Sequence, residues 1–225
     1  PEIAVTLDAG RIIMLPKTLD HPGDRLAPSR AAVLVIDMQH DFCAEDGYVE
    51  RVVGLSTQAC REVAVPITAL VDQARRAGVP VIWIRAIYDH DRLPPGILTK
   101  QRAKGADICC STGSAGAAFY AVKPEDSEAI FDKHSYSAFV GTGLAEWLAA
   151  RDIRSLVFAG VQTNVCVESS LRDAVCRGFY CTIAEDCVAS HSPALHKATL
   201  ANTAALMGDV MWSDEITSHW AKTPA

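Results

Sequence analysis

The 225-residue sequence has a net charge of −6, with 49% hydrophobic and 21% charged residues. These values are typical of a globular enzyme of one domain with a large core. The negative charge and the lack of a Lys/Arg cluster argue against a nucleic-acid partner. No apolar run approaches the ~20 residues of a membrane span, and no secretory signal is visible. We therefore predict a cytoplasmic protein that binds neither nucleic acid nor membrane.

Eight cysteines could form four disulfides, but a large, core-rich chain without a visible signal favours reduced thiols. Their spacing also lacks the paired C-x₂₋₄-C pattern of structural zinc sites. A zinc-binding protein is thus the weaker interpretation. The cysteines are Cys43, Cys60, Cys109, Cys110, Cys166, Cys176, Cys181 and Cys187.

The chain divides into an N-terminal arm, residues 1–30, and a single domain, residues 31–225. The arm has two short extended pieces, Ile3–Leu7 and Arg11–Leu15, and packs either on the body or on a neighbouring subunit. The domain opens with a continuous apolar run, Ala31–Ile36, which predicts a buried strand.

Apolar residues then recur at helical spacing over Thr57–Ala77, and Gly78 ends that helix. Residues 88–127 are irregular, rich in Pro, Gly and Ser, and a loop of this length is usually functional or a lid. The other predicted strands are Val79–Ile84, Ala129–Phe131, Leu156–Ala159, Tyr180–Ala184 and Val210–Trp212. The other predicted helices are Gly143–Arg151, a helix that begins beside Cys166, and Pro193–Met207.

Strands that alternate with helices predict an α/β fold, a three-layer α-β-α arrangement around a mostly parallel sheet. Ligands of such sheets bind beyond the carboxyl ends of the strands. Asp37, Lys133 and the turn from Gly160 to Cys166 all fall at such ends. We therefore expect these side chains to meet in one crevice.

Cys166 lies where an apolar strand gives way to an amphipathic helix, with Thr163 and Asn164 as candidate N-caps. Helix N–H groups there favour a thiolate. Taken singly, Cys166 reads as a small core residue, Asp37 as a turn cap and Lys133 as a solvated side chain. Together they can form a nucleophilic unit, because a thiol needs a base to take its proton and a cation to hold the thiolate.

Three motifs carry a family resemblance: Asp37–Phe42, Lys133 ahead of Ser135–Phe139, and Gly160–Val167. Together they resemble the isochorismatase-like cysteine hydrolases, over residues 31–212. The resemblance implies a triad of Asp37, Lys133 and Cys166. It also implies a cis peptide between Val161 and Gln162, which places the N–H groups of Gln162 and Cys166 as an oxyanion hole. It further implies a homodimer or homotetramer that needs no cofactor.

The motifs also bear on the branch of the family. Isochorismatases that cleave a vinyl ether lack the nucleophilic cysteine, so the presence of Cys166 argues against vinyl-ether cleavage. Metal-dependent nicotinamidases carry Asp-x-His and a second histidine after the second strand, and Asp89-His90-Asp91 departs from that pattern, so we predict no metal. Asp41–Cys43 with Gly47–Glu50 is similar to biuret hydrolases, and Asn164–Asp173 is similar to ureidoacrylate amidohydrolases.

The prediction is a cysteine-dependent amidohydrolase that cleaves a C–N bond of a small linear ureide or carbamoyl compound, of the biuret, triuret or ureidoacrylate type. Two other amidase activities stay open, on nicotinamide and on N-carbamoyl amino acids. A redox-sensing or binding protein on the same fold is the non-enzyme alternative. The residues expected to hold a flat polar ureide are Gln39, Phe42, Tyr88, Tyr136 and Gln162.

Overall fold

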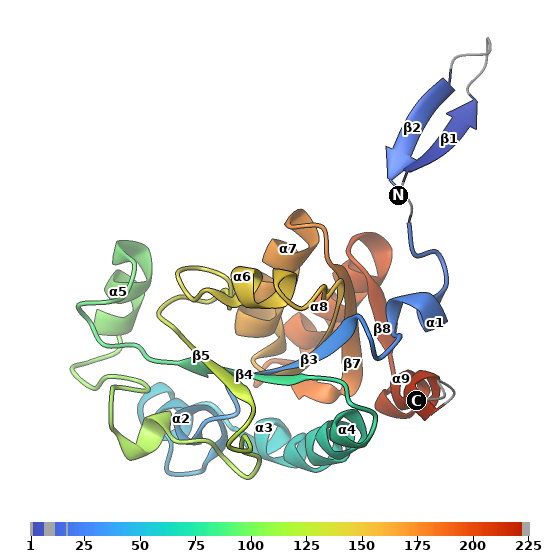
Figure 1. The fold of residues 1–225 in the computed structure, drawn as a ribbon. Coiled ribbons are helices and arrows are strands. Elements are labelled where there is room, and N and C mark those ends of the chain that lie inside the picture. The colour runs from blue at the N-terminus through green and yellow to red at the C-terminus, as the bar shows by residue number, and fades with distance from the viewer. Residues whose placement is uncertain (1, 7–11, 17, 222–225) are drawn as a thin grey trace.

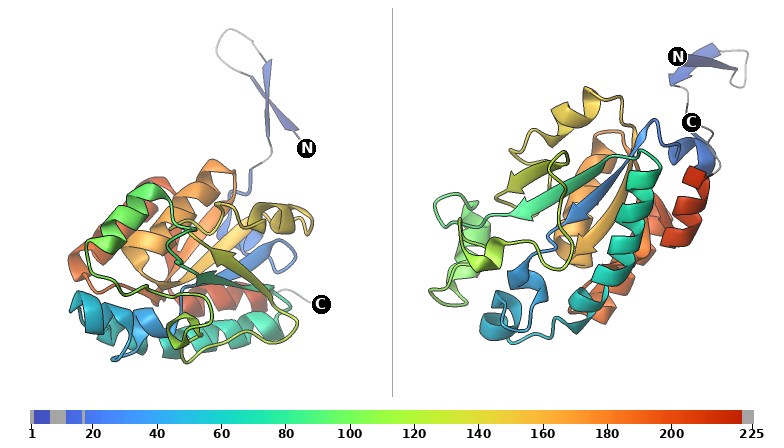
Figure 2. Two further views of the ribbon diagram at one scale, coloured as in Figure 1. Left: turned by 90° about the vertical axis from the view of Figure 1, so that its left-hand side faces the viewer. Right: turned by 60° about the horizontal axis from the view of Figure 1, so that its bottom comes forward.

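The computed structural model describes residues 2–6, 12–16 and 18–221. Strands β1 (Glu2–Thr6) and β2 (Ile12–Pro16) pair in antiparallel fashion as a hairpin. Figures 1 and 2 show this hairpin outside the layered body of the protein. The two extended pieces predicted for the N-terminal arm are therefore present, each shifted by one residue.

The centre of the molecule is a six-stranded sheet with the order β5-β4-β3-β6-β7-β8, in which every neighbouring pair is parallel. All six predicted strands are present: β3 has the predicted bounds, β5, β6 and β7 are longer than predicted, and β4 and β8 are shifted by two residues and one residue. Their bounds are β3 (Ala31–Ile36), β4 (Val81–Ala86), β5 (Ala129–Lys133), β6 (Ser155–Val161), β7 (Tyr180–Ala189) and β8 (Asp209–Met211).

Helices cover both faces of the sheet (Figure 1). One core contains residues from α3 (Gln58–Glu62), α4 (Ala64–Arg76) and α9 (Ser213–Ala221). The opposite core contains residues from α6 (Leu144–Ala149) and α7 (Glu168–Cys176), with α8 (Pro193–Leu206) packed against it. Because side chains alternate along a strand, β3 contributes Val33 and Val35 to the first core and Leu34 and Ile36 to the second. The predicted three-layer α/β architecture is confirmed.

The strand order reverses between β3 and β6, which lie side by side at the centre of the sheet. From β3 the chain builds outward through β4 to the edge strand β5, and from β6 it builds in the other direction through β7 to β8. Such a reversal leaves a crevice between the loops that follow the two central strands. Asp37 follows β3, and the turn that carries Cys166 follows β6.

The helix predicted over Thr57–Ala77 is divided, because α3 ends at Glu62 and α4 begins at Ala64. Pro66 explains the division: it has no N–H to donate to the carbonyl of Glu62, and its ring crowds that carbonyl. The segment 88–127, expected to be irregular, contains α5 (Pro95–Arg102) and a short 3₁₀ turn, Ala115–Ala117. Pro95 stands at the helix start, where its missing N–H costs nothing.

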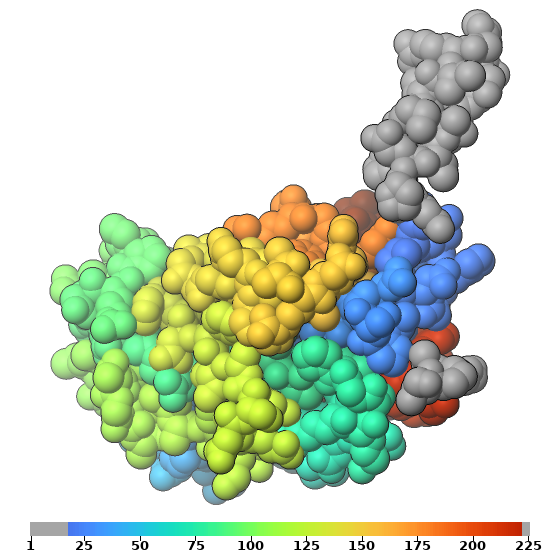
Figure 3. Space-filling view, viewed as in Figure 1, coloured from blue at the N-terminus to red at the C-terminus, as the bar shows by residue number. Residues whose placement is uncertain are grey.

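Three further short helical segments occur: α1 (Pro22–Arg25), α2 (His40–Cys43) and η2 (Val49–Val53), the last with π-type bonding. The sequence did not predict them, nor helix α9. In Figure 3, the segment from α5 to β5, coloured green to yellow-green, covers much of one side of the face toward the viewer. Throughout the described residues, every helix is too short or too polar to cross a bilayer.

Candidate active site

Asp37, Lys133 and Cys166 meet at the carboxyl ends of three different strands. The Lys133 Nζ lies 2.9 Å from the Asp37 Oδ2 and 3.3 Å from the Cys166 Sγ. All three side chains are buried, with Lys133 fully enclosed. The convergence expected from the strand ends is therefore present, with the Lys133 ammonium in direct contact with both the Asp37 carboxylate and the Cys166 thiol.

Lys133 reaches this point from the edge of the sheet. It is the last residue of β5 and pairs with Ala86 at the end of β4, so its side chain passes the end of β4 to reach Asp37 beyond β3. The carbonyl of Ser135 and the hydroxyl of Tyr88 each accept a hydrogen bond from its ammonium, both at 3.0 Å. These oxygens fix the ammonium and compensate part of its lost hydration.

The turn after β6 brings Cys166 beside the end of β3. The peptide bond between Val161 and Gln162 is cis, as the resemblance implies. Gly160 has φ +115°, and a Cβ there would lie 2.0 Å from the carbonyl oxygen of Ile36, so only glycine allows this approach of the two strands. Residues Thr163–Val167 then form a π-helical turn, η4, that leads into α7.

The predicted N-caps of this helix are wrong. The N-cap residue is Gln162, and its side chain makes no capping hydrogen bond. The hydroxyl of Thr163 contacts the Nδ1 of His196 at 2.9 Å, and the side-chain oxygen of Asn164 accepts a hydrogen bond from Ser190. Both polar side chains therefore fasten the turn to the neighbouring loop and to α8, because the π-type turn carries them away from the helix start.

Asp37 is held in an unusual backbone conformation, with φ +53°. Its contact with Lys133 is an ion pair, and neither carboxylate oxygen has a partner with hydrogen-bond geometry among the side chains of residues 18–221. A carboxylate with free lone pairs beside a thiol is suited to accept the thiol proton.

Burial shifts the pKa values of Cys166, Asp37 and Lys133. Desolvation and the nearby Asp37 charge, opposed by the Lys133 charge, together raise the pKa of Cys166 to about 12. Desolvation also raises the pKa of Asp37, partly offset by Lys133. Desolvation lowers the pKa of Lys133, but the Asp37 charge and the contacts with Asp37 and Cys166 outweigh it, so this pKa is raised. The Cys166 thiol is therefore neutral at neutral pH and lies beside the Asp37–Lys133 pair.

Asp37 and Cys166 line a cavity of about 180 Å³. Four of the five residues predicted to bind substrate line it, while the walls are mostly apolar or aromatic. Those four are Phe42, Tyr88, Tyr136 and Gln162. The lining residues that the sequence did not suggest are Tyr48, Val49, Val53, Leu55, Gln101, Lys104, Cys109, Val165 and His191.

Gln39, the fifth predicted substrate residue, lies outside this cavity and has a structural position. It is fully buried, and its amide nitrogen donates to the carbonyls of Ala86 and Ala117, at 2.9 and 3.0 Å. Its amide oxygen accepts a hydrogen bond from the Ala86 N–H at 2.7 Å. Both donors are thus used in joining the end of β4 to the loop before β5, so the expectation that Gln39 faces the substrate is wrong.

Two residues that line the cavity, Tyr88 and Gln162, also make contacts around Cys166. The hydroxyl of Tyr88 lies 3.6 Å from the Cys166 Sγ as well as beside Lys133. The side-chain amide of Gln162 donates to the Cys60 Sγ at 3.3 Å and accepts from the His191 N–H at 3.0 Å. Tyr88 therefore belongs to the polar environment of the thiol, and Gln162 ties the Cys166 turn to the loop after β7.

The histidine and carboxylates after β4 do not gather as metal ligands. Both oxygens of Asp89 accept hydrogen bonds from Thr112. Within residues 18–221, one group of His, Cys, Asp or Glu side chains has its ligand atoms within 4.8 Å of one another: Asp41, Cys109 and Cys110. The Asp41 oxygens there already accept the N–H groups of Tyr48 and Cys110. All eight cysteines are free thiols, as predicted.

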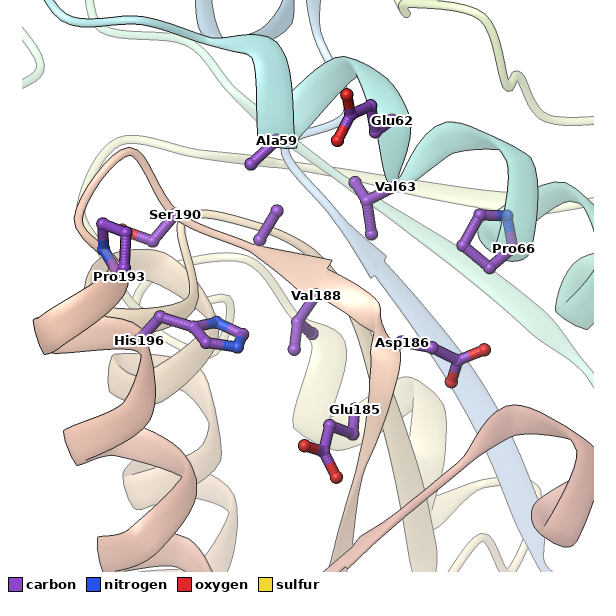
Figure 4. Close-up of a pocket in the computed structure, with 11 residues that line it drawn as sticks. Ala59, Glu62, Val63, Pro66, Glu185, Asp186, Val188, Ser190, Pro193 and His196 are labelled. Carbon is purple, nitrogen blue, oxygen red and sulfur yellow. The ribbon is translucent and has the colours of Figure 1, made fainter.

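A second hollow is larger, about 350 Å³ (Figure 4). It is bounded by α3 and α4 on one side and by β7 and α8 on the other. Glu62, Glu185 and Asp186 give it acidic walls, but Asp186 accepts hydrogen bonds from Ser213 at the start of α9. It contains no cysteine among its lining residues.

The chain matches the Isochorismatase domain over residues 31–215. It is 33% identical, over 81% of its length and 86% of the relative, to ureidoacrylate amidohydrolase RutB of Agrobacterium fabrum. Its fold is similar to a cysteine hydrolase of Pseudomonas syringae pv. phaseolicola, with TM-score 0.77 and 27% identity over 86% of this chain and 93% of the other. It is also similar to N-carbamoylsarcosine amidase of Thermoplasma acidophilum, with TM-score 0.68 and 25% identity over 82% and 97%. The resemblance seen in the sequence is confirmed: the chain belongs to the isochorismatase domain family.

Proposed function

We propose that this chain, an amide hydrolase by its family and relatives, cleaves the C–N bond of a small linear ureide through Cys166. One observation carries the proposal. The Lys133 ammonium lies 2.9 Å from the Asp37 carboxylate and 3.3 Å from the Cys166 sulfur, at the inner end of a cavity of about 180 Å³. A nucleophile, a base and a cation in mutual contact are the groups that an acyl transfer needs.

The first half of the reaction forms a covalent acyl-enzyme. The Cys166 thiol is neutral at rest, so Asp37 takes its proton as the sulfur attacks the substrate carbonyl carbon. Lys133 stabilises the negative charge that develops on sulfur. The carbonyl oxygen becomes an oxyanion and accepts hydrogen bonds from the backbone N–H groups of Gln162 and Cys166. Protonated Asp37 then gives its proton to the leaving nitrogen, and the C–N bond breaks.

The second half restores the enzyme with one water molecule. Asp37 takes a proton from water, whose oxygen attacks the thioester carbon of the acyl-enzyme. The C–S bond breaks, and Asp37 returns a proton to the Cys166 sulfur. Overall one amide bond and one water are consumed, and an amine or ammonia and a carboxylic or carbamic acid are released. Asp37 thus acts alternately as base and acid, while Lys133 keeps its proton throughout.

The cavity suits a small substrate with a flat polar head. Phe42, Tyr88 and Tyr136 offer aromatic surfaces, and Tyr88 and Gln162 add polar groups near the sulfur. Biuret, triuret and ureidoacrylate are all of suitable size for about 180 Å³. A site that hydrogen-bonds the N–H and carbonyl edges of a ureide rejects an aromatic amide that leaves those groups unpaired. Nicotinamide is therefore expected to be a far poorer substrate.

The test compares kcat/KM for biuret, triuret, ureidoacrylate, an N-carbamoyl amino acid and nicotinamide with one enzyme preparation, by ammonia release. We expect a ureide to exceed nicotinamide by at least about a hundredfold. A higher kcat/KM for nicotinamide refutes the ureide assignment while leaving the Cys166 mechanism to be tested separately.

The mechanism uses no metal, and the proposal includes that absence as a prediction. Chelator treatment should leave the turnover rate unchanged, and metal analysis should be substoichiometric. If chelation abolished activity and zinc, iron or manganese restored it, a metal-dependent, nicotinamidase-like function would be favoured instead.

A homodimer or homotetramer is also part of the proposal. Exposed apolar side chains support it: Leu195 and Leu206 on α8 are 51% and 82% exposed, and Trp212 after β8 is 56% exposed. An exposed apolar patch often marks a subunit interface, and these three side chains are candidates for one. Light scattering at several protein concentrations measures the mass, and a monomer at all of them refutes this part.

A further inference from the structure

The outer part of the active-site cavity contains polar residues that the reaction does not use. Lys104 follows α5, and His191 follows β7, so two distant parts of the chain contribute to one wall. Lys104 is exposed, and within residues 18–221 no carboxylate lies within ion-pair distance of its ammonium. Its charge is therefore available to a ligand.

The charges around the cavity are unequal. Asp37 and Lys104 are the two charged side chains that line it, and Asp37 is already paired with Lys133. The cavity thus presents one uncompensated positive charge, although the whole chain carries −6. A single cation in a small cavity favours a small monoanion and disfavours a second cation.

His191 supplies a second, independent observation. Its ring Nδ1 is shielded from solvent and has no hydrogen-bond partner among residues 18–221. Burial and the nearby Lys104 charge lower the pKa of His191, so its ring is neutral at neutral pH. Its backbone N–H is bonded to Gln162 at 3.0 Å, which holds the residue beside the Cys166 turn. A polar ring that lines the cavity near Lys104 can supply a hydrogen bond to a ligand.

We infer that Lys104 and His191 form a carboxylate-binding subsite, so that the substrate is a ureide bearing a carboxylate. This inference rests on the proposed function and selects within it. The remaining wall, Val49, Val53 and Leu55, is apolar and suits a short carbon chain between the two polar ends. The urea group lies at Cys166 and the carboxylate at Lys104. Ureidoacrylate belongs to this class of compound, whereas biuret and triuret are neutral and leave Lys104 unused.

The experiment uses two substrates that differ only at the carboxylate, 3-ureidoacrylate and its uncharged methyl ester, with biuret as a neutral reference. Each is assayed by ammonia release with the wild type, Lys104→Gln, Lys104→Arg and Lys104→Glu. Lys100→Gln is the matched control, because Lys100 is an exposed lysine on the neighbouring α5 and is outside the cavity lining. His191→Phe keeps a ring but removes both nitrogens.

Lys104→Gln is expected to raise KM for 3-ureidoacrylate by at least about tenfold, since a hydrogen bond to a charged group is lost, and to alter the values for the ester and biuret far less. Lys104→Arg restores most of the affinity, Lys104→Glu weakens it further, and His191→Phe raises KM for the anion more than for the ester. Rising ionic strength lowers kcat/KM for the anion in the wild type and has less effect in Lys104→Gln.

Equal losses on the anion and the ester in Lys104→Gln overturn the inference, as does a wild type that prefers biuret or the ester. In both of those cases ureide hydrolysis is present, so the proposed function stands. A wild type that cleaves none of the three compounds overturns the proposed function itself. The two failures are therefore distinguishable in one set of assays.

Discussion

The larger of the two hollows in this molecule has fewer polar groups free to react than the smaller one. The larger, about 350 Å³, has three acidic residues and a histidine in its walls, yet Asp186 is tied to Ser213 and His196 contacts Thr163. The smaller, about 180 Å³, has a free thiol, a base and a cation in contact. Volume alone is therefore a poor guide to a candidate active site, and the contacts between its polar groups are a better one.

The difference follows from where each hollow lies in the fold. The smaller one lies at the carboxyl ends of β3 and β6, where the strand order reverses and loops from both halves of the sheet meet. The larger one lies along a flank, between α3–α4 and β7–α8. Helices packed on a strand bring side chains together for packing, so a hollow there has less reason to collect reactive groups.

The largest expected effect comes from removing the thiol. Cys166→Ala should lower kcat by at least about a thousandfold, because the covalent route is closed, while thermal unfolding changes little. Cys176→Ser is the matched control, since Cys176 is an exposed cysteine on the helix that follows Cys166. Substantial turnover by Cys166→Ala would exclude covalent catalysis.

Changes to the base should be nearly as damaging. Asp37→Asn keeps the size of the side chain but cannot take the thiol proton, so we expect a loss of at least about a hundredfold in kcat. The double variant Asp37→Asn with Cys166→Ala should be no slower than Cys166→Ala alone, because groups that act as a unit are not additive. Losses that simply multiply would contradict a shared unit.

A smaller effect is expected from pH. Desolvation raises the pKa of Asp37 above its usual 3.8, so the ionised carboxylate that acts as base is lost earlier as pH falls. The value of kcat/KM should fall about tenfold per pH unit below that raised pKa. A pH–rate profile of the free enzyme measures it. An acid limb centred at or below 3.8 would show that burial does not control this carboxylate.

The smallest effect is expected in the larger hollow. Glu62→Gln and Glu185→Gln each remove a charge from its wall. Neither residue lines the cavity at Cys166, so kcat/KM should stay within about twofold, as for most surface changes far from the chemistry. A loss comparable with that of Asp37→Asn would mean that the two hollows are functionally linked.

The central strands could be predicted closely because their residues are apolar without a break. The predicted bounds of Ala31–Ile36 are those of β3, and the Cys166 strand needed only a short extension. The convergence of Asp37, Lys133 and Cys166 followed from parallel topology, since each stands at a strand end. Helix α5 was missed because Pro94 and Pro95 were taken as loop residues, although proline is well placed at a helix start.

The outer wall of the cavity was harder to predict. β7 continues to Ala189 through the polar pair Glu185 and Asp186, where its pairing with β6 shifts register. A strand ending at Ala184 left His191 far from any strand end, so its place beside Gln162 was missed. Lys104 gave no local signal at all, because its position depends on how the loop after α5 packs over the sheet.

Lys133 stands on the edge strand, and this has a consequence for assembly of the active enzyme. β5 pairs only with β4, so it is held by a single ladder of hydrogen bonds. A slip of two residues along that ladder would carry the ammonium about 6.6 Å from Asp37 and leave a buried carboxylate without its counter-charge. The register of this edge strand therefore sets both the charge balance of the buried carboxylate and the arrangement of the proposed triad, so a misaligned edge is expected to cost stability and activity together.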